Sequence, residues 1–183
     1  VNKQGQLYGY NTDAEGFAYP LQGKTVANAM VLGNGGAARA VLYQLCVMGV
    51  KSISLVARDH SKSNAYCNAL QQQFNVTIQP NSFKTVQQSN VQSAALIINT
   101  TSVGLSPNDT PFDFIKQVSK GQVFYDLIYN PAETTMMALC KQQGAEVING
   151  AAMLAHQAAL AFNLFFNHPA DTQIMLQVLE GHI

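Results

Sequence analysis

The stretch that decides the fold of this chain is Met30-Val31-Leu32-Gly33-Asn34-Gly35-Gly36-Ala37-Ala38. An apolar run ends in a cluster of glycines, and a helix-forming sequence follows directly. This order is typical of a buried parallel strand that turns tightly into a helix, whose free N–H groups and positive dipole end favour a phosphate. The stretch therefore predicts a nucleotide site, and the alternative is a structural turn between a strand and a helix.

The small residues of this turn have separate expected roles. Gly33 would make the tight turn, Gly35 would let the backbone approach the phosphates, and Ala38 would permit close packing of helix on strand. The expected ligand of this turn is the pyrophosphate of a dinucleotide. The predicted cofactor-binding turn comprises Gly33, Asn34, Gly35, Gly36, Ala37 and Ala38.

Strand-like and helix-like segments alternate along the chain, which is the pattern of a parallel sheet built from βαβ units. The predicted strands are 29–32, 52–56, 76–78, 94–98, 123–126 and 146–148. The predicted helices are 36–48, 61–74, 133–143, 150–166 and 172–179, with a serine cap at Ser61 and glycine stops at Gly49 and Gly144. We expect an α/β fold: a Rossmann-like, doubly wound, mostly parallel sheet with helices on both faces. The expected parts are a linker or helix segment (1–20), a dinucleotide-binding domain (21–149) and C-terminal helices (150–183).

The composition limits the partners of the chain. Its 183 residues suffice for one sizeable α/β domain, and 10 basic against 10 acidic residues leave no net charge to attract nucleic acid or an anionic membrane. No apolar run has the length of a transmembrane helix, and no signal peptide precedes the first strand. Cys46, Cys67 and Cys140 show neither metal-ligand nor disulfide spacing. We expect a cytoplasmic protein with reduced, partly buried thiols, no metal, and neither nucleic acid nor membrane as partner.

The residues after the second predicted strand, Ala57-Arg58-Asp59-His60-Ser61-Lys62, are expected at the adenosine ribose. Arg58 can stack on adenine and hold a 2′-phosphate, and Lys62 can add a second positive charge. Asp59 can instead accept hydrogen bonds from a free 2′-hydroxyl and would repel a phosphate. The alternative is a solvated loop with incidental charges.

Five ordered motifs extend over nearly the whole chain. They are Gly9-Tyr10-Asn11-Thr12-Asp13, Gly33 to Ala40, Asn99-Thr100-Thr101-Ser102-Val103-Gly104, Tyr125 to Pro131, and Gly150 to Gln157. Together they resemble the shikimate dehydrogenases, including their quinate/shikimate dehydrogenase relatives. The resemblance implies an oxidoreductase that interconverts shikimate and 3-dehydroshikimate with NADP(H), in the pathway to chorismate and the aromatic amino acids.

The resemblance also implies roles for single residues. Asp13 matches the aspartate that works beside a lysine on the proton of the substrate hydroxyl, whereas its sequence context alone favours an Asx-turn in a loop. Tyr129 and Gln157 match substrate contacts, with core packing and a satisfied backbone group as the alternatives. Gly150 matches a glycine beside the nicotinamide, with a helix N-cap as the alternative. The resemblance also matches three residues, with lower specificity, to positions that border the cofactor: Thr100, Thr101 and Leu127.

The chain departs from the family pattern in two ways. The usual Asn-Arg-Thr at the ribose is Ala57-Arg58-Asp59 here, so we favour NADP and keep NAD as the alternative. The family also has an N-terminal domain that carries the catalytic lysine, and nothing before Val1 supplies it. We therefore expect the cofactor-binding portion of the enzyme, inactive alone, with a small-molecule substrate and with a homodimer as one option. The rivals are an NAD-using quinate/shikimate dehydrogenase and a dinucleotide-binding module without catalysis.

Overall fold

Six strands pair in parallel in the order β5-β4-β3-β6-β7-β8 in the computed structural model, which describes residues 1–106, 109 and 112–181. The sequence predicts a strand at each of these six places, although the strand predicted over 76–78 extends to Ser82. All pairings in this sheet are parallel, and the strand order reverses between β3 and β6, as in doubly wound α/β folds. The strands are β3 (Asn28–Leu32), β4 (Ser52–Ala57), β5 (Thr77–Ser82), β6 (Leu96–Asn99), β7 (Val123–Asp126) and β8 (Glu146–Ile148).

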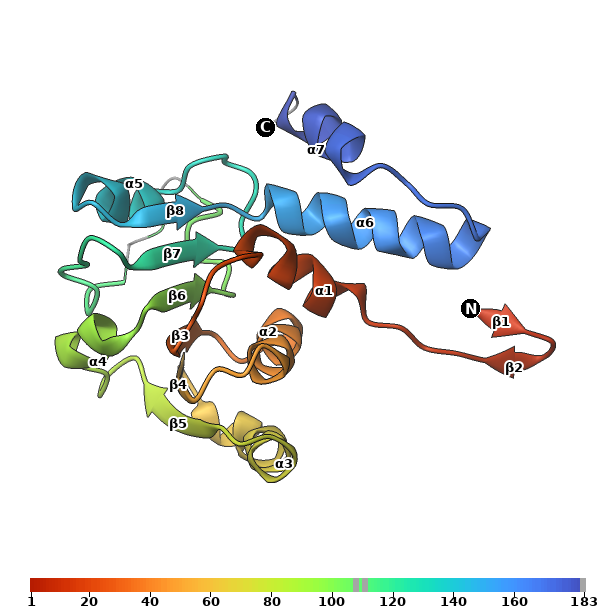
Figure 1. The fold of residues 1–183 in the computed structure, drawn as a ribbon. Coiled ribbons are helices and arrows are strands. Elements are labelled where there is room, and N and C mark those ends of the chain that lie inside the picture. Colours follow the sequence, from red (N-terminus) through yellow and green to blue (C-terminus); the bar gives the residue numbers. More distant parts are fainter. Residues whose placement is uncertain (107–108, 110–111, 182–183) are drawn as a thin grey trace.

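Helices cover both faces of the sheet (Figure 1). Successive residues of a strand point to opposite faces, so Ala29 and Val31 join one core with α2 and α3, while Met30 and Leu32 join a second core with α4 and α5. Both cores are fully apolar along β3, which explains why its sequence is a continuous apolar run. The four helices are α2 (Gly36–Val47), α3 (Asn64–Gln73), α4 (Gln88–Ser93) and α5 (Thr135–Gln142).

A further group of helices lies beyond the sheet edge. The 16-residue α6 (Ala151–Phe166) packs against α1 (Thr12–Ala18) and carries α7 (Thr172–Glu180) on its other side. Polar contacts join α7 to the preceding helices: His156 Nδ1 lies 3.2 Å from Thr172 Oγ1, and Gln173 Nε2 donates to Tyr19 Oη at 2.9 Å. The rings of Tyr19 and His156 stack with their centroids 4.2 Å apart. These contacts form a joint between the 3-10 helix that follows α1 (Tyr19–Leu21), α6 and α7.

The local structure corrects several expectations. Ser61 is not the cap of a helix over 61–74: the Asp59 carboxylate caps a 3-10 helix, η2 (His60–Ser63), and α3 begins only at Asn64. The helix α4 and the antiparallel hairpin of β1 (Asn2–Lys3) and β2 (Gln6–Leu7), which stands away from the sheet in Figure 1, were not predicted. The glycine stops are confirmed, because Gly49 and Gly144 follow α2 and α5 with φ of +82° and +89°.

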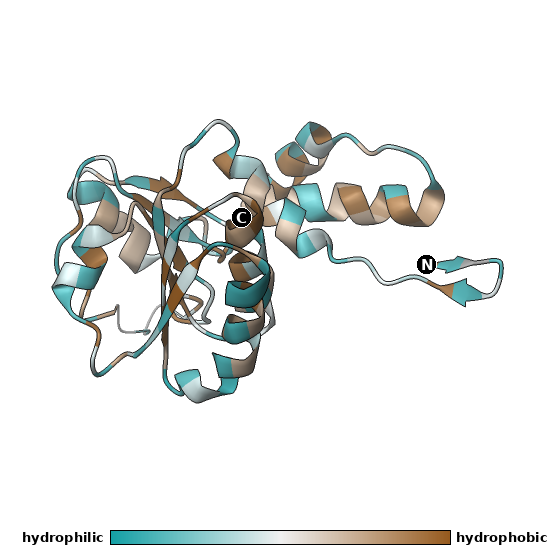
Figure 2. Ribbon diagram, turned by 60° about the horizontal axis from the view of Figure 1, so that its bottom comes forward, coloured by the Kyte–Doolittle hydropathy of each residue, from teal (hydrophilic) through white to brown (hydrophobic). Residues whose placement is uncertain are grey.

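Apolar side chains remain exposed on the C-terminal helices. Phe165 and Phe166 of α6 are 70% and 66% exposed, and Ile174 of α7 is 60% exposed. Figure 2 shows hydrophobic segments along these helices, away from the sheet. None of the helices in the described part of the chain is both long and apolar enough to span a bilayer.

Candidate cofactor-binding site

A cavity of about 630 Å³ opens at the carboxyl ends of β3, β4 and β6. The parallel register aligns Leu32 with Val56 and with Asn99, so the residues that follow these three strands meet at one edge of the sheet. This edge is the topological switch point, where doubly wound folds bind their ligands. The lining residues are Gly33, Asn34, Gly35, Ala57, Arg58, Phe83, Thr100, Thr101, Ser102, Val103, Phe112, Asp113 and Phe114.

Gly33 has two structural reasons to be glycine. Its φ of +104° lies in the left-handed region, and a Cβ placed on it would lie 2.6 Å from Thr100 Oγ1. Thr100 Oγ1 donates to the Leu32 carbonyl at 2.6 Å, and Gly33 N donates to the Val56 carbonyl at 2.8 Å. The glycine turn and the Asn-Thr-Thr motif, which are far apart in sequence, are therefore packed against each other.

Gly35 is different, because nothing lies within 4 Å of the Cβ it lacks. It is the N-cap of α2, with φ of −79°, and no side chain caps the helix. The first N–H groups of α2 thus face open space at the rim of the cavity, which is the geometry that receives a phosphate. Ala38 in the first turn is fully buried and packs α2 on the sheet, as expected. The glycine turn with the uncapped N-terminus of α2 fits a dinucleotide pyrophosphate.

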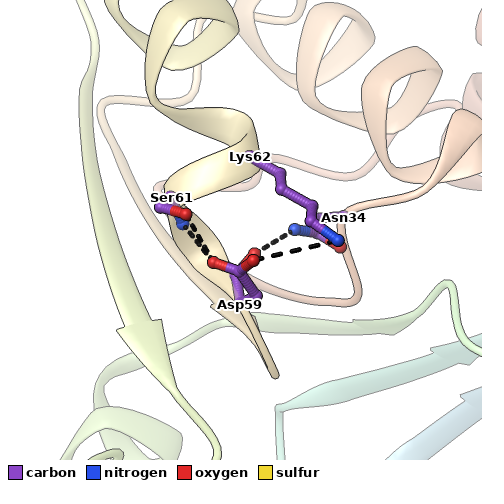
Figure 3. A network of polar contacts seen from close by, with 4 residues as sticks. All are labelled: Asn34, Asp59, Ser61 and Lys62. Atoms are coloured by element: carbon purple, nitrogen blue, oxygen red, sulfur yellow. Dashed lines mark hydrogen bonds and ion pairs between the residues drawn. The ribbon is translucent and has the colours of Figure 1, made fainter.

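The loop after β4 contains a small polar network (Figure 3). The Asp59 carboxylate accepts hydrogen bonds from the amide and the hydroxyl of Ser61, and Lys62 Nζ lies 3.8 Å from Asp59 Oδ2. The Ser61 hydroxyl is the main cause that lowers the pKa of the Asp59 carboxyl. Asn34 Nδ2 donates to the Asp59 carbonyl at 2.7 Å and joins the glycine turn to this network.

Arg58 stands apart from that network. Its side chain is exposed, lines the cavity, and forms no ion pair with the described residues. The Asp59 carboxylate therefore accepts hydrogen bonds from Ser61 and lies near Lys62, while the guanidinium of Arg58 is available at the cavity. This arrangement favours an anionic group near Arg58.

A buried polar network that the sequence analysis missed shapes the loops after β6 and β7. Asn99 Nδ2 donates to Asp126 Oδ1 at 3.0 Å, and Asn99 Oδ1 accepts from the amide and hydroxyl of Thr101 at 3.0 and 2.7 Å. Thr134 Oγ1 donates to Asp126 Oδ2 at 2.8 Å. Burial raises the pKa of Asp126, against these hydrogen bonds. The signal for it was two polar residues, Asn99 and Asp126, at the ends of apolar strands.

Gly150 is required by close backbone packing. A Cβ on Gly150 would lie 2.1 Å from the Leu127 carbonyl oxygen, and Gly150 N donates to the Ile128 carbonyl at 2.9 Å. The residue is also the N-cap of α6. Gly150 and Leu127 are thus brought together at the end of β7, and the structural contact accounts for the glycine without a ligand.

Asp13 and Gln157 lie on two helices that cross closely. A Cβ on Gly16 of α1 would lie 2.9 Å from the Met153 carbonyl oxygen and 3.0 Å from Gln157 Cβ. Asp13 is in the first turn of α1, three residues before Gly16, and therefore shares its side of the helix. The carboxylate of Asp13 forms no hydrogen bond or ion pair with the part of the chain that the structure describes.

The structure separates the predicted residues into groups. Gly33, Asn34, Gly35, Arg58, Thr100 and Thr101 line the cavity. Tyr129 is 40% exposed in the loop after β7 and, like Leu127, Gly150, Asp13 and Gln157, lies outside the cavity lining. The lining residues that the sequence analysis did not single out include Phe83, Phe112 and Phe114.

The three cysteines do not contribute reactive groups. Cys46, Cys67 and Cys140 are free and buried, as predicted. Burial raises the pKa of Cys46 to about 11 and of Cys140 to about 12. Among residues 1–106, 109 and 112–181, no three His, Cys, Asp or Glu side chains are grouped to hold a metal ion.

Comparison with known proteins gives consistent matches. A family model described as the shikimate 5′-dehydrogenase C-terminal domain matches residues 150–180. A shikimate dehydrogenase (NADP(+)) of Bacillus cereus (strain B4264) is 35% identical over 189 residues, covering 98% of this chain and 66% of that protein. The chain therefore spans about two thirds of the length of this relative.

Solved structures match over the same extent. The ligand-free 5-ketofructose reductase of Gluconobacter sp. strain CHM43 superposes with a TM-score of 0.87 at 28% identity, covering 100% of this chain and 67% of that chain. A shikimate dehydrogenase in complex with NADP+ superposes with a TM-score of 0.85 at 29% identity, covering 99% of this chain and 64% of that chain. Both similarities extend over the whole sheet and the C-terminal helices.

Proposed function

The chain belongs to the shikimate dehydrogenase family, and from this we propose that it supplies the dinucleotide-binding part of an NADP(H)-dependent enzyme. The reaction is the interconversion of shikimate and 3-dehydroshikimate, a step towards chorismate and the aromatic amino acids. One observation carries the proposal: the uncapped start of α2 and the guanidinium of Arg58 share one cavity at the switch point of the sheet.

Different residues in and beside the cavity bind different parts of the dinucleotide. The N–H groups of Gly35, Gly36 and Ala37 hold the pyrophosphate, and Gly35 has the open space that this approach needs. Arg58 holds the 2′-phosphate, and Lys62 adds positive charge from η2. Arg58 and Lys62 supply two positive charges against the single carboxylate of Asp59, so NADP is preferred over NAD.

The substrate side of the site is assigned to α1, α6 and the loop after β7. Bound NADP+ supplies the hydride acceptor, and the residues of the chain orient the substrate and move its proton. Gln157 and Tyr129 bind the substrate, and Asp13 orients its hydroxyl and shares the proton with a lysine. Thr100, Thr101, Leu127 and Gly150 border the cofactor.

Several finer points belong to the same proposal. The catalytic lysine comes from a substrate domain outside the 183 residues, so the chain alone is inactive. Residues 21–149 form the dinucleotide-binding domain, and residues 1–20 and 150–183 face the substrate domain. The exposed apolar side chains of α6 and α7 are the surface for such packing or for a homodimer. The buried free thiols fit a cytoplasmic location.

The experiment that tests the function uses a longer protein that contains this chain and the substrate domain. NADP+ and NAD+ are each titrated in the presence of shikimate or quinate, and reduced cofactor is followed by absorbance. We expect the fastest reduction with NADP+ and shikimate. Faster reduction with NAD+ and quinate would favour the quinate/shikimate rival, and cofactor binding without reduction would favour the binding module.

A further inference from the structure

Three phenylalanines form a connected aromatic cluster on the wall of the cavity. The ring centroids of Phe83 and Phe112 are 5.7 Å apart, those of Phe83 and Phe114 are 5.9 Å apart, and those of Phe112 and Phe114 are 5.8 Å apart. Phe83 follows β5, whereas Phe112 and Phe114 belong to the connection between β6 and β7. The fold therefore brings rings from two distant segments together at this wall.

One ring of the cluster, Phe112, is buried, and the other two, Phe83 and Phe114, are partly exposed. Phe112 is 9% exposed and belongs to the core that lies under α4 and α5. Phe83 and Phe114 are only half-buried, and all three rings line the cavity together with Gly33 and Arg58. Phe83 is nearly parallel to Phe112, with 15° between the ring planes, and Phe114 is tilted by 34° to Phe83, so the half-buried rings present apolar aromatic surface to a ligand as well as packing on each other.

The position of the rings indicates which half of the dinucleotide they would contact. The pyrophosphate is assigned to the glycine turn after β3, and the cavity continues from there towards Arg58 after β4 and Phe83 after β5. Gly150, assigned to the nicotinamide, follows β8 and packs on Leu127 after β7, so both lie on the other side of β3 and outside the cavity lining. The rings thus lie on the adenosine side.

We propose that Phe83, Phe112 and Phe114 are the stacking surface for the purine base of the dinucleotide. This inference rests on the proposed function and adds three residues that belong to none of the five motifs. An uncharged purine gains from an aromatic face, and the nearby Arg58 guanidinium adds a cationic plane. Asp113, the acidic residue of the lining, is exposed and does not oppose a neutral base.

The test compares Phe114→Leu and Phe83→Leu with a matched control, Phe74→Leu. Phe74 is also half-buried, but it packs against Tyr43 outside the cavity. Calorimetric titrations with NADP+ and with adenosine 2′,5′-bisphosphate measure the affinity, and thermal melts confirm folding. We expect each cavity variant to bind both ligands about 10-fold more weakly, and the control to bind them as the wild type does.

A second variant separates stacking from packing. Phe114→Trp keeps an aromatic face, so it should retain affinity for adenosine 2′,5′-bisphosphate, whereas a residue that only packs would tolerate leucine better than tryptophan. Unchanged affinity in Phe114→Leu and Phe83→Leu, or an equal loss in Phe74→Leu, would overturn the stacking surface. Failure of the wild type to bind NADP+ would instead contradict the proposed function.

Discussion

Gly33 leaves the space that the hydroxyl of Thr100 occupies. The Cβ that Gly33 lacks would lie 2.6 Å from Thr100 Oγ1, which donates to the carbonyl of Leu32 immediately before the glycine. The phosphate turn is therefore built by two segments, and its shape depends on the loop after β6 as well as on the glycines themselves.

Gly33→Ala should destabilise the fold. The substitution introduces a side chain at φ of +104° and a clash with Thr100, so we expect a loss of at least about 2 kcal/mol in the free energy of unfolding. Urea denaturation followed by circular dichroism measures this loss. Gly23→Ala is the control, because Gly23 also has positive φ but no atom within 4 Å of its missing Cβ. Equal losses in the two variants would show that the contact with Thr100 carries no energy.

Arg58→Ala should weaken NADP+ far more than NAD+. The guanidinium is exposed at the cavity, and its loss removes a charge-assisted contact to the 2′-phosphate, which corresponds to roughly 10- to 100-fold in affinity. Fluorescence titration with both cofactors measures the ratio. Equal losses for the two would mean that Arg58 only stacks on the adenine.

Asp59→Asn should leave the preference for NADP+ nearly unchanged. Asparagine also caps helices, and the wild-type carboxylate is already engaged by Ser61 and Lys62. The same two titrations measure the preference. A large gain in NADP+ affinity would show that the carboxylate of Asp59 repels the phosphate.

Asp13→Asn in the complete enzyme should lower turnover by about 10²- to 10⁴-fold, because the carboxylate is assigned to the proton transfer. Cofactor affinity should stay unchanged, since Asp13 lies outside the cavity lining. Glu15→Gln is the matched control, an exposed acid on the same helix. Normal turnover in Asp13→Asn would remove its catalytic role.

The joint between α6 and α7 should weaken in acid. Burial lowers the pKa of His156 below its ordinary value of 6.5, against the opposing effect of Glu15, so the unfolded chain binds more protons than the folded one as the pH falls through 6.5. Stability is thus lost on acidification. His156→Gln should reduce the slope of melting temperature between pH 7 and pH 5, and the exposed His168→Gln should not. An unchanged slope in His156→Gln would contradict this source of pH dependence.

The sheet could be predicted because its central strands β3, β6 and β7 are mainly apolar and buried, whereas the polar sequence of β5 explains why only 76–78 was predicted of a strand that extends over Thr77–Ser82. The helix α4 escaped prediction because Val91 is its one buried residue, so its sequence has no apolar period. The hairpin of β1 and β2 has strands of two residues, too short for an alternating pattern. The helix α1 has Gly16 in its interior, which lowers helix propensity, and it is stabilised by close packing on α6.

The part of the site that lies in one continuous sequence segment, the glycine turn, could be predicted from its local pattern. The role of Asp59 could not be predicted, because a cap of a 3-10 helix depends on the path of the chain after β4. The wall of Phe83, Phe112 and Phe114 combines segments that only the folded sheet brings together. The bond between Asn99 and Asp126 likewise depends on the pairing of β6 with β7.

Gly35→Val tests the central claim most directly, that the turn before α2 binds the dinucleotide. The fold tolerates the side chain, since φ is −79° and nothing lies within 4 Å of the missing Cβ, but valine would occupy the space of the pyrophosphate. Calorimetric titration with NADP+ should show binding by the wild type and none by the variant, while thermal melts show that both proteins are folded. Equal affinity in the two folded proteins would contradict the phosphate site.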